Sequence, residues 1–208
     1  MNEYIKFGHF PQTATGDNLP IEWLVLKREK NKALVISRYV LTVRPFHKWH
    51  EPVLWGDSTL MYWLDSVFPL IAFSQEEKDA IIETNIPVAT NITRPDVCDS
   101  SMKCSVFILD AKEAAELFPD DEDRLCIPTP HVIATQNYWH SKFFTIDGVA
   151  TTLWWLRTTG KDALHASFIT VSGHIEEDPE YLAKIQDPTY GVRPAMWVDL
   201  DKLSHAPT

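Results

Sequence analysis

The sequence contains few cysteines, only three among 208 residues. Cys98, Cys104 and Cys126 form no CxxC pair and show no Cys/His spacing typical of a metal site, and their odd number argues against a disulfide framework. We therefore expect reduced thiols, as in cytosolic proteins. A bridge between Cys98 and Cys104 stays open as an alternative if the chain is exported.

Glycine is also scarce, and its seven copies are scattered along the chain. The sequence lacks GxGxxG, GxxxxGKS/T, GxSxG, HExxH and an EF-hand loop. These absences exclude the common motifs of dinucleotide binding, phosphate loops, serine hydrolases, zinc proteases and calcium sensors. We accordingly expect no cofactor.

Basic residues are fewer than acidic ones: the chain has 19 Lys and Arg and 29 Asp and Glu, which gives a net charge of −10. This is the wrong sign for a domain that holds nucleic acid through its phosphates. No run approaches the roughly 18 apolar residues of a membrane helix, and the N-terminus MNEYIKFGHF has no basic segment followed by an apolar one. We expect no nucleic-acid partner, no membrane insertion and a cytoplasmic location, with a phage-borne protein or another export route left open.

Hydrophobic residues, in contrast, make up 45% of the chain and include 8 Trp, 6 Tyr and 10 Phe. This composition provides ample apolar area for a core and differs from that of disordered chains. The length lies at the upper end of the single-domain range, so we expect one domain over residues 1–208.

The first forty residues have the composition of strands. Residues 4–10 and 21–26 are separated by the turn-rich PQTATGDNLP, and the polar run 27–32 lies between the apolar segments IEWLVL and ALVISRYVL. This pattern predicts an antiparallel hairpin. Residues 41–57 carry two prolines, a glycine and the cluster FHKWH without helical or strand period, which indicates an ordered loop.

Helix start signals occur in the middle third of the chain. The expected helices are one capped by Ser58 and running through Phe68, one opened by the capping box Ser74–Glu77 and running to Thr84, one over Ala111–Phe118 capped by Asp110 with Glu113, and one from Thr129-Pro130 to Tyr138. Between the second and third helices we expect a loop with an edge strand at Ile86–Thr90, then a buried strand at Ser105–Leu109.

Short β segments return after residue 152, as LWWLR, HASFITVSGHI and GVRPAMWVDL. In the middle segment Ile169 and Val171 alternate with Phe168 and Thr170, so we expect one strand with the first pair buried and the second pair exposed. The alternative is that the loop over 176–188 covers Phe168. Strands at both ends and helices between them predict an α+β fold.

Histidines and acidic runs are the possible metal ligands. The candidate sites are His47 with His50, His165 with His174, the acidic run Asp120–Asp123 and the acidic run Glu176–Asp178. Two histidines without a further ligand pair make a weak site, and acidic runs are more often solvated. We therefore expect no metal.

Four ordered motifs carry a resemblance over nearly the whole chain: FGHFPQ at 7–12, IEWLVL at 21–26, WWLRTTG at 154–160 and YGVRPAMW at 190–197. They resemble a bacterial family with the motifs FGxYPQ, WxVL, WWLRSPG and VRPALW. That family is similar to the C-type-lectin fold in the version shared by formylglycine-generating enzymes and the variable proteins of diversity-generating retroelements.

The resemblance implies an α+β, C-type-lectin-like fold with antiparallel strands, a few short helices and long ordered loops. It implies that WWLRTTG and GVRPAMW are fixed scaffold strands and that Lys161–Glu177 is the stretch diversified by reverse-transcription errors at template adenines. The implied function is ligand binding by the displayed side chains. The enzymes of this fold need paired cysteines near the C-terminus, and no cysteine follows Cys126 here.

Our main hypothesis is therefore a recognition domain for a protein or glycan ligand, and the alternative is an enzyme or metal-dependent binder that uses His and acidic residues on the same face. The predicted ligand-binding residues are Asp162, His165, Phe168, Thr170, His174 and Tyr181. The predicted structural residues are Trp154, Trp155, Arg157, Arg193 and Trp197. Because Arg157 and Arg193 lie in apolar strands, we expect core ionic pairing for both.

Overall fold

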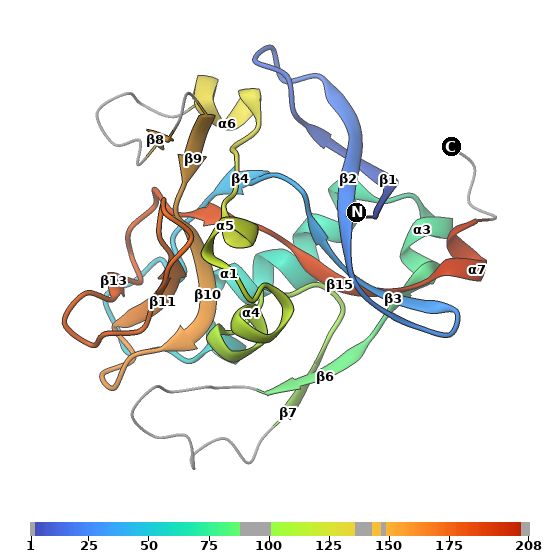
Figure 1. The fold of residues 1–208 in the computed structure, drawn as a ribbon. Helices are drawn as coiled ribbons and strands as arrows, with labels where there is room; N and C mark the ends of the chain where they lie inside the picture. Colours follow the sequence, from blue (N-terminus) through green and yellow to red (C-terminus); the bar gives the residue numbers. More distant parts are fainter. Residues whose placement is uncertain (1–2, 88–100, 136–142, 147–148, 205–208) are drawn as a thin grey trace.

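The computed structural model describes residues 3–87, 101–135, 143–146 and 149–204. Within these ranges the protein consists mostly of strands in two main sheets, with several short helices around them (Figure 1). The prediction of a mixed helix and strand protein is confirmed at this level.

The first sheet contains five strands in the order β1-β2-β3-β15-β5, and all its neighbouring pairs are antiparallel. Its strands are β1 Tyr4–Pro11, β2 Asn18–Glu29, β3 Lys32–Ser37, β15 Ala195–Asp199 and β5 Ile81–Ile82. The expected hairpin is confirmed, although β2 runs to Glu29 and the turn consists only of Lys30 and Asn31. Lys30 adopts a positive φ of 56° in this tight turn.

The second sheet has the order β12-β11-β10-β14-β4, and β13 also pairs with β11. Its strands are β12 Ile175–Glu176, β11 His165–Ile169, β10 Trp154–Thr159, β14 Gly191–Val192, β4 Thr42–Val43 and β13 Ala183–Lys184. The pair β10–β14 is parallel and the others are antiparallel. The segment GVRPAMWVDL, expected to be one strand, is instead divided at Arg193-Pro194 between β14 and β15, so it passes from one sheet to the other.

The helices are short, and the four that were predicted begin at their start signals, after Ser58, Ser74, Asp110 and Thr129. They are η1 Trp55–Asp57, α1 Thr59–Tyr62, a π-helical turn η2 Trp63–Val67, α2 Phe68–Ala72, α3 Gln75–Ala80, α4 Ala111–Leu117, α5 Asp121–Arg124, α6 Pro130–Thr135 and α7 Leu200–Leu203. Ser58 Oγ accepts from the Met61 N–H, and the capping boxes of α3 and α4 are both complete. The expected continuation of α6 to Tyr138 lies outside the described residues.

Three expectations for the middle of the chain are corrected. Helix α3 ends at Ala80, because residues 81–82 form β5 beside β15. The segment Ser105–Leu109 is buried but forms only an isolated bridge between Phe107 and Ala195. The strand expected at Ile86–Thr90 begins earlier, as β6 Thr84–Pro87 paired with β7 Ser101–Cys104, and residues 88–90 lie outside the described ranges.

A further hairpin of β8 Phe143–Ile146 and β9 Val149–Thr152 precedes β10. The buried side chains of the two main sheets and of the helices form one apolar cluster. Trp23, Trp55, Trp154 and Trp155 are its largest members, each fully buried. The second sheet therefore rests on the same core as the first, and its outer turns are held by that core.

Candidate functional site

The predicted binding segment is a hairpin and not one long strand. Strand β11 ends at Ile169, the chain turns through Thr170–His174, and β12 returns beside β11 with Ile169 opposite Ile175. Gly173 has a φ of 86°, which suits the turn. His165 and Thr170 thus lie at opposite ends of β11, about 16 Å apart at the usual rise per residue.

Phe168 is not exposed, so the expectation that its ring faces outward is wrong. Only 8% of it is accessible, and its ring packs edge-on against Tyr190 with centroids 4.9 Å apart. The cross-strand neighbour of Phe168 is the buried Trp155. Residues 166–169 are all buried, because other segments cover both faces of β11. Alternation along a strand indicates two faces but does not tell whether the second face is covered.

At the N-terminal end of β11, Asp162 and His165 form a polar pair in the turn from β10. Asp162 Oδ2 lies 2.8 Å from His165 Nδ1, and Asp162 Oδ1 accepts a 2.9 Å hydrogen bond from the Leu164 N–H. Burial tends to raise the pKa of Asp162, but the hydrogen bonds from Leu164 and His165 outweigh it and hold that pKa below its ordinary value. The carboxylate is therefore ionised and oriented at neutral pH.

The backbone of this turn is fixed from several sides. The Gly160 N–H donates to the His165 carbonyl at 2.8 Å, and the Ala163 carbonyl accepts from the Val53 N–H at 3.0 Å. The Leu164 carbonyl accepts from the Ile185 N–H at 3.1 Å. Ala163 adopts a positive φ of 53°, a sparsely populated conformation that these bonds maintain.

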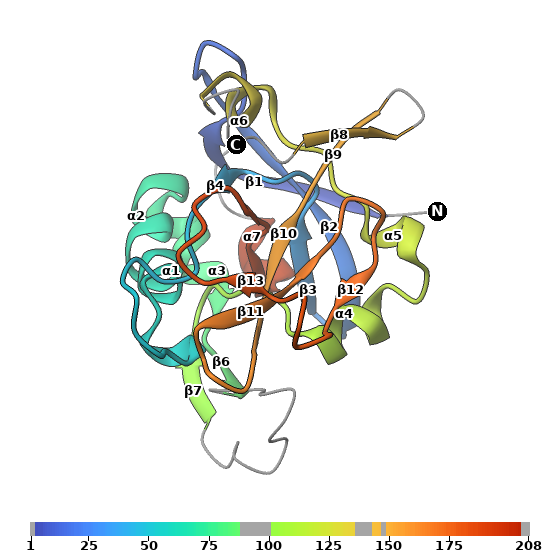
Figure 2. The same ribbon diagram turned by 90° about the vertical axis from the view of Figure 1, so that its left-hand side faces the viewer.

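A pocket of about 370 Å³ opens at this turn, and we call it the turn pocket. Its lining residues are Gly160, Lys161, Asp162, His165, Pro179 and Leu182. Figure 2 shows the strands that carry it, β10, β11 and β13, on the side facing the viewer. A Cβ on Gly160 would lie 2.7 Å from Leu182, so the glycine leaves the space that Leu182 occupies in the wall of the turn pocket. Tyr181, which precedes Leu182 in the chain, is 66% exposed.

The other end of β11 has a different character. Thr170 Oγ1 lies 2.9 Å from Ser172 Oγ and accepts from the His174 N–H, so it stabilises the turn. His174 is exposed and lies 4.0 Å from Asp121. The six predicted binding residues thus separate into Asp162, His165 and the nearby Tyr181 at one end, Thr170 and His174 at the other, and the buried Phe168 between.

Most of the predicted structural residues are buried in the core, as expected. Trp154 and Trp155 are fully buried, and their indole N–H groups donate to the carbonyls of Arg124 at 3.0 Å and Arg44 at 2.8 Å. Trp197 is only partly buried and packs at the edge of the core, so it is less central than predicted.

Arg157 forms the buried ion pair that was expected. Its guanidinium makes bonds of 2.6 and 2.7 Å to the two carboxylate oxygens of Glu113 and one of 2.9 Å to Asp110. Burial opposes the charge of Arg157, but these carboxylates outweigh it and raise its pKa. Burial raises the pKa of Asp110, and Arg157 counters that effect in part.

Arg193 does not pair with a carboxylate among the described residues, so ionic pairing is wrong for this residue. Its Nε donates to the Ser37 carbonyl at 3.1 Å, and its guanidinium lies 4.8 Å from the Trp154 ring centroid and 5.7 Å from that of Phe118. Burial lowers the pKa of Arg193. Aromatic faces and a carbonyl replace the expected ion pair, because the space around Arg193 is filled by the core tryptophan and the end of α4.

The metal candidates are dispersed. His47 is buried beside Glu51 at 3.3 Å, whereas His50 contacts Gln186 at 2.9 Å. Within residues 3–87, 101–135, 143–146 and 149–204, no three His, Cys, Asp or Glu side chains come together as a metal site. Over the same ranges, no helix has both the length and the apolar character needed to cross a membrane.

Two of the three cysteines lie in the described part of the chain. Cys104 and Cys126 are free and buried, and burial together with Asp65 raises the pKa of Cys104 to about 12. Cys98, the other member of the alternative bridge, lies outside the described residues.

The sequence analysis did not identify Lys161, Pro179 and Leu182 as site residues, although they line the turn pocket. Pro179 and Leu182 belong to a loop without a motif, and only its pairing through β13 with β11 brings it to the turn. The exposed Tyr181 between them was the available signal.

Comparisons with known proteins give one match. A family model described as Domain of unknown function (DUF6273) matches residues 30–200. No curated protein and no solved structure matches the chain. The matched range contains both ends of β11 and the whole lining of the turn pocket.

Proposed function

This chain belongs to the family described as Domain of unknown function (DUF6273), and we propose that it is a binding domain that recognises a protein or glycan ligand at the turn pocket. The observation that carries the proposal is the combination of an oriented Asp162–His165 pair with an apolar wall and an exposed tyrosine. Ligand sites commonly join apolar surface with a few oriented polar groups.

The polar and apolar parts of the turn pocket have separate roles in this proposal. Asp162 accepts hydrogen bonds from a hydroxyl or amide of the ligand, and Lys161 offers a donor at the rim. Tyr181 contributes a rigid aromatic surface, the type of residue that dominates binding energy at interfaces. Because the turn is hydrogen-bonded on several sides, little ordering accompanies binding.

We also propose that the fold is C-type-lectin-like and that the chain is a variable protein of a diversity-generating retroelement. In support, the ends of the segment 161–177 are exposed at Lys161, Asp162, Ser172, His174 and Glu177, while its middle, residues 166–169, is buried. Diversified positions would have to lie among these exposed residues. The genomic test is a neighbouring reverse-transcriptase gene with a template repeat nearly identical to the 3′ end; its absence would contradict the retroelement proposal.

The binding proposal is tested with the triple variant Asp162→Ala, His165→Ala and Tyr181→Ala. A ligand is first selected with the wild-type protein on a glycan array and from a displayed peptide library. Asp162 and Tyr181 are exposed and His165 is half-buried at the surface. Surface substitutions normally change stability by about ±0.5 kcal/mol each, so the variant should melt within a few degrees of the wild type. Its affinity for the selected ligand should fall below detection in calorimetry.

The matched control is Thr170→Ala with His174→Ala, at the other end of β11. This control should keep the affinity, and its melting temperature should fall only slightly, because Thr170→Ala removes the hydrogen bond from the His174 N–H. If the triple variant binds as tightly as the wild type, the site lies elsewhere. If only the control variant loses binding, the turn over 170–174 is the ligand surface instead.

The Asp162–His165 hydrogen bond also favours a second candidate, an enzyme in which His165 acts as a general base. A carboxylate at Nδ1 orients the imidazole and leaves Nε2 for proton transfer. Turnover of a substrate that is abolished by His165→Gln would support this candidate. A stoichiometric metal in the purified protein, with a melting temperature lowered by chelator, would support the metal-dependent form of it.

A further inference from the structure

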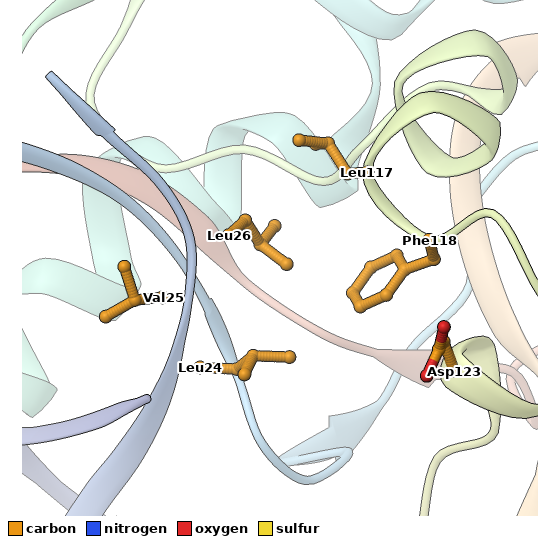
Figure 3. Close-up of a pocket in the computed structure, with 6 residues that line it drawn as sticks. All are labelled: Leu24, Val25, Leu26, Leu117, Phe118 and Asp123. Carbon is orange, nitrogen blue, oxygen red and sulfur yellow. The ribbon is translucent and has the colours of Figure 1, made fainter. Parts of the chain in front are cut away.

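Strand β2 borders one pocket at its middle and another at its end, and neither shares a residue with the turn pocket. Figure 3 shows the pocket at the middle, which has a volume of about 220 Å³ and is lined by Leu24, Val25, Leu26, Leu117, Phe118 and Asp123. Most of its accessible lining is polar, and the aromatic residue among these six, Phe118, is buried. This pocket therefore presents no exposed aromatic surface to a ligand.

The pocket at the end of β2 has a different lining, and we call it the Trp197 pocket. Its volume is about 290 Å³, and its lining includes Glu29, Lys32, Ile82, Glu83, Asn85 and Trp197. Figure 1 shows the β2–β3 hairpin in blue and β6 in green, the two elements that carry most of these residues. The volume is close to the lower end of the roughly 300–1,000 Å³ of sites for small-molecule ligands. The Trp197 pocket therefore suits a single small ring.

Trp197 supplies the aromatic surface of this pocket. On β15 it stands between its cross-strand neighbours Leu34 of β3 and Ile82 of β5, and its side chain is only partly buried. Among the described residues its indole N–H has no hydrogen-bond acceptor, and the protein does not enclose this group. Trp197 thus offers a ligand both apolar ring surface and a hydrogen-bond donor.

Polar groups with spare hydrogen-bonding capacity lie beside this ring. The exposed Asn85 amide makes no side-chain hydrogen bond within the described part of the chain, so its donors and its acceptor are available to a ligand. The accessible lining of the Trp197 pocket is about equally polar and apolar. A matching ligand therefore needs an apolar face together with several groups that donate and accept hydrogen bonds.

Charges of both signs surround the Trp197 pocket. A carboxylate oxygen of Glu29 lies 2.6 Å from Lys27 Nζ, and one of Glu83 lies 2.9 Å from Lys103 Nζ. Lys32 is exposed and adds a further positive charge to the lining. A charged ligand of either sign would meet a like charge here. The pocket therefore favours an uncharged ligand.

We propose that the Trp197 pocket binds one uncharged sugar ring of a saccharide. A sugar ring has a face of C–H groups, which packs on the Trp197 indole, and a rim of hydroxyls that each donate and accept hydrogen bonds. These hydroxyls bond to the Asn85 amide and to the indole N–H, and the carboxylates of Glu29 and Glu83 accept from the others. This site is separate from the turn pocket and does not depend on the ligand proposed there.

The test titrates the full chain with the uncharged methyl glycosides of glucose, galactose and mannose. Binding is followed through the NMR signal of the Trp197 indole N–H, which is assigned by its loss in Trp197→Phe. We expect at least one glycoside to shift this signal, and the uronic acid and amino sugar forms of the same glycoside to bind more weakly. Asn85→Ala should keep the melting temperature and weaken the binding about fivefold, as expected for the loss of one hydrogen bond.

The matched control is Asn18→Ala, which removes the same exposed side chain from the opposite end of β2. It should leave the affinity unchanged, and so should the turn-pocket variant Asp162→Ala with His165→Ala. The proposal would be overturned if no glycoside shifts the indole signal, if a charged form binds more tightly, or if both Asn variants lose affinity equally. Loss of binding in the turn-pocket variant would also overturn it, because the sugar would then be bound at the turn pocket.

Discussion

At the residue scale, the positive charges of two buried arginines are stabilised by different neighbours. Arg157 is surrounded by Asp110 and Glu113, whereas Arg193 lies between aromatic rings and one carbonyl. Removing one member of a buried ion pair leaves an uncompensated charge, while removing an unpaired buried charge does not. An apolar substitution should therefore cost much more stability at Arg157 than at Arg193.

We predict that Arg157→Met destabilises the protein by about 3–5 kcal/mol, because it leaves the buried Asp110 and the half-buried Glu113 without their cation. Arg193→Met, the matched substitution, should change stability by less than about 1.5 kcal/mol, as volume-conserving core changes do. Urea unfolding of both variants measures the difference. Equal losses would contradict the difference between a paired and an unpaired buried arginine.

The same pair predicts a pH dependence. Burial already raises the pKa of Asp110 in the folded protein, and the loss of Arg157 removes the charge that counters it. A group with a raised folded pKa contributes stability below its unfolded pKa, and this contribution is lost as the pH rises through the folded pKa. The difference in free energy of unfolding between the wild type and Arg157→Met should thus be smaller at pH 4 than at pH 7, as measured by urea titrations. A larger difference at pH 4 would contradict this prediction.

At the element scale, the turn between β11 and β12 depends on one close contact with helix α5. Arg124 Nε donates to the Gly173 carbonyl at 2.8 Å, and a Cβ on Gly173 would lie 1.8 Å from the Asp121 carbonyl oxygen. In helix α5, the Arg124 carbonyl also accepts a hydrogen bond from the Trp154 indole N–H. The turn, the short helix and the core tryptophan therefore form one connected unit.

We predict that Gly173→Ala costs at least 1–2 kcal/mol, roughly the strain of a disfavoured φ, with the displacement of α5 added to it. Ser172→Ala, the neighbouring exposed position, is the control and should stay within about ±0.5 kcal/mol. Thermal unfolding gives the stability, and amide exchange of residues 121–124 reports on α5. Wild-type protection of α5 in Gly173→Ala would show that the two elements are not coupled.

At the scale of the whole molecule, both sheets rest on a single core. Trp155 lies in the second sheet and stacks on Tyr190 at 4.2 Å, while Trp197 lies in the first sheet and is only partly buried. The chain crosses between the sheets at Arg193-Pro194. Loss of a central core ring should therefore weaken both sheets together.

We predict that Trp155→Ala lowers stability by about 3–5 kcal/mol, as large-to-small core changes do, and that Trp197→Ala costs clearly less because its indole is partly exposed. Fluorescence and far-UV circular dichroism should show one coincident transition in each variant. Two separate transitions in Trp155→Ala would show that the sheets unfold independently.

The sequence by itself determined the local features of this protein. The caps at Ser58, Ser74 and Asp110, the hairpin at Lys30 and the strand content of both ends act through backbone hydrogen bonds within a few residues, so they can be read from neighbouring positions. Of the binding residues predicted from the sequence, Asp162 and His165 line the turn pocket, and Tyr181 precedes its lining residue Leu182.

Only the tertiary structure decided which faces are covered and which charges meet. Phe168 is buried because Tyr190 returns to cover it, and Arg157 finds its counterions in the cap of a helix 44 residues away. Pro179 and Leu182 reach the turn pocket because β13 pairs with β11, and no local sequence pattern predicts this pairing. Burial of a strand face and the pairing of a buried charge depend on segments that are distant in the sequence, so periodicity and spacing can indicate a face but cannot tell what lies on it.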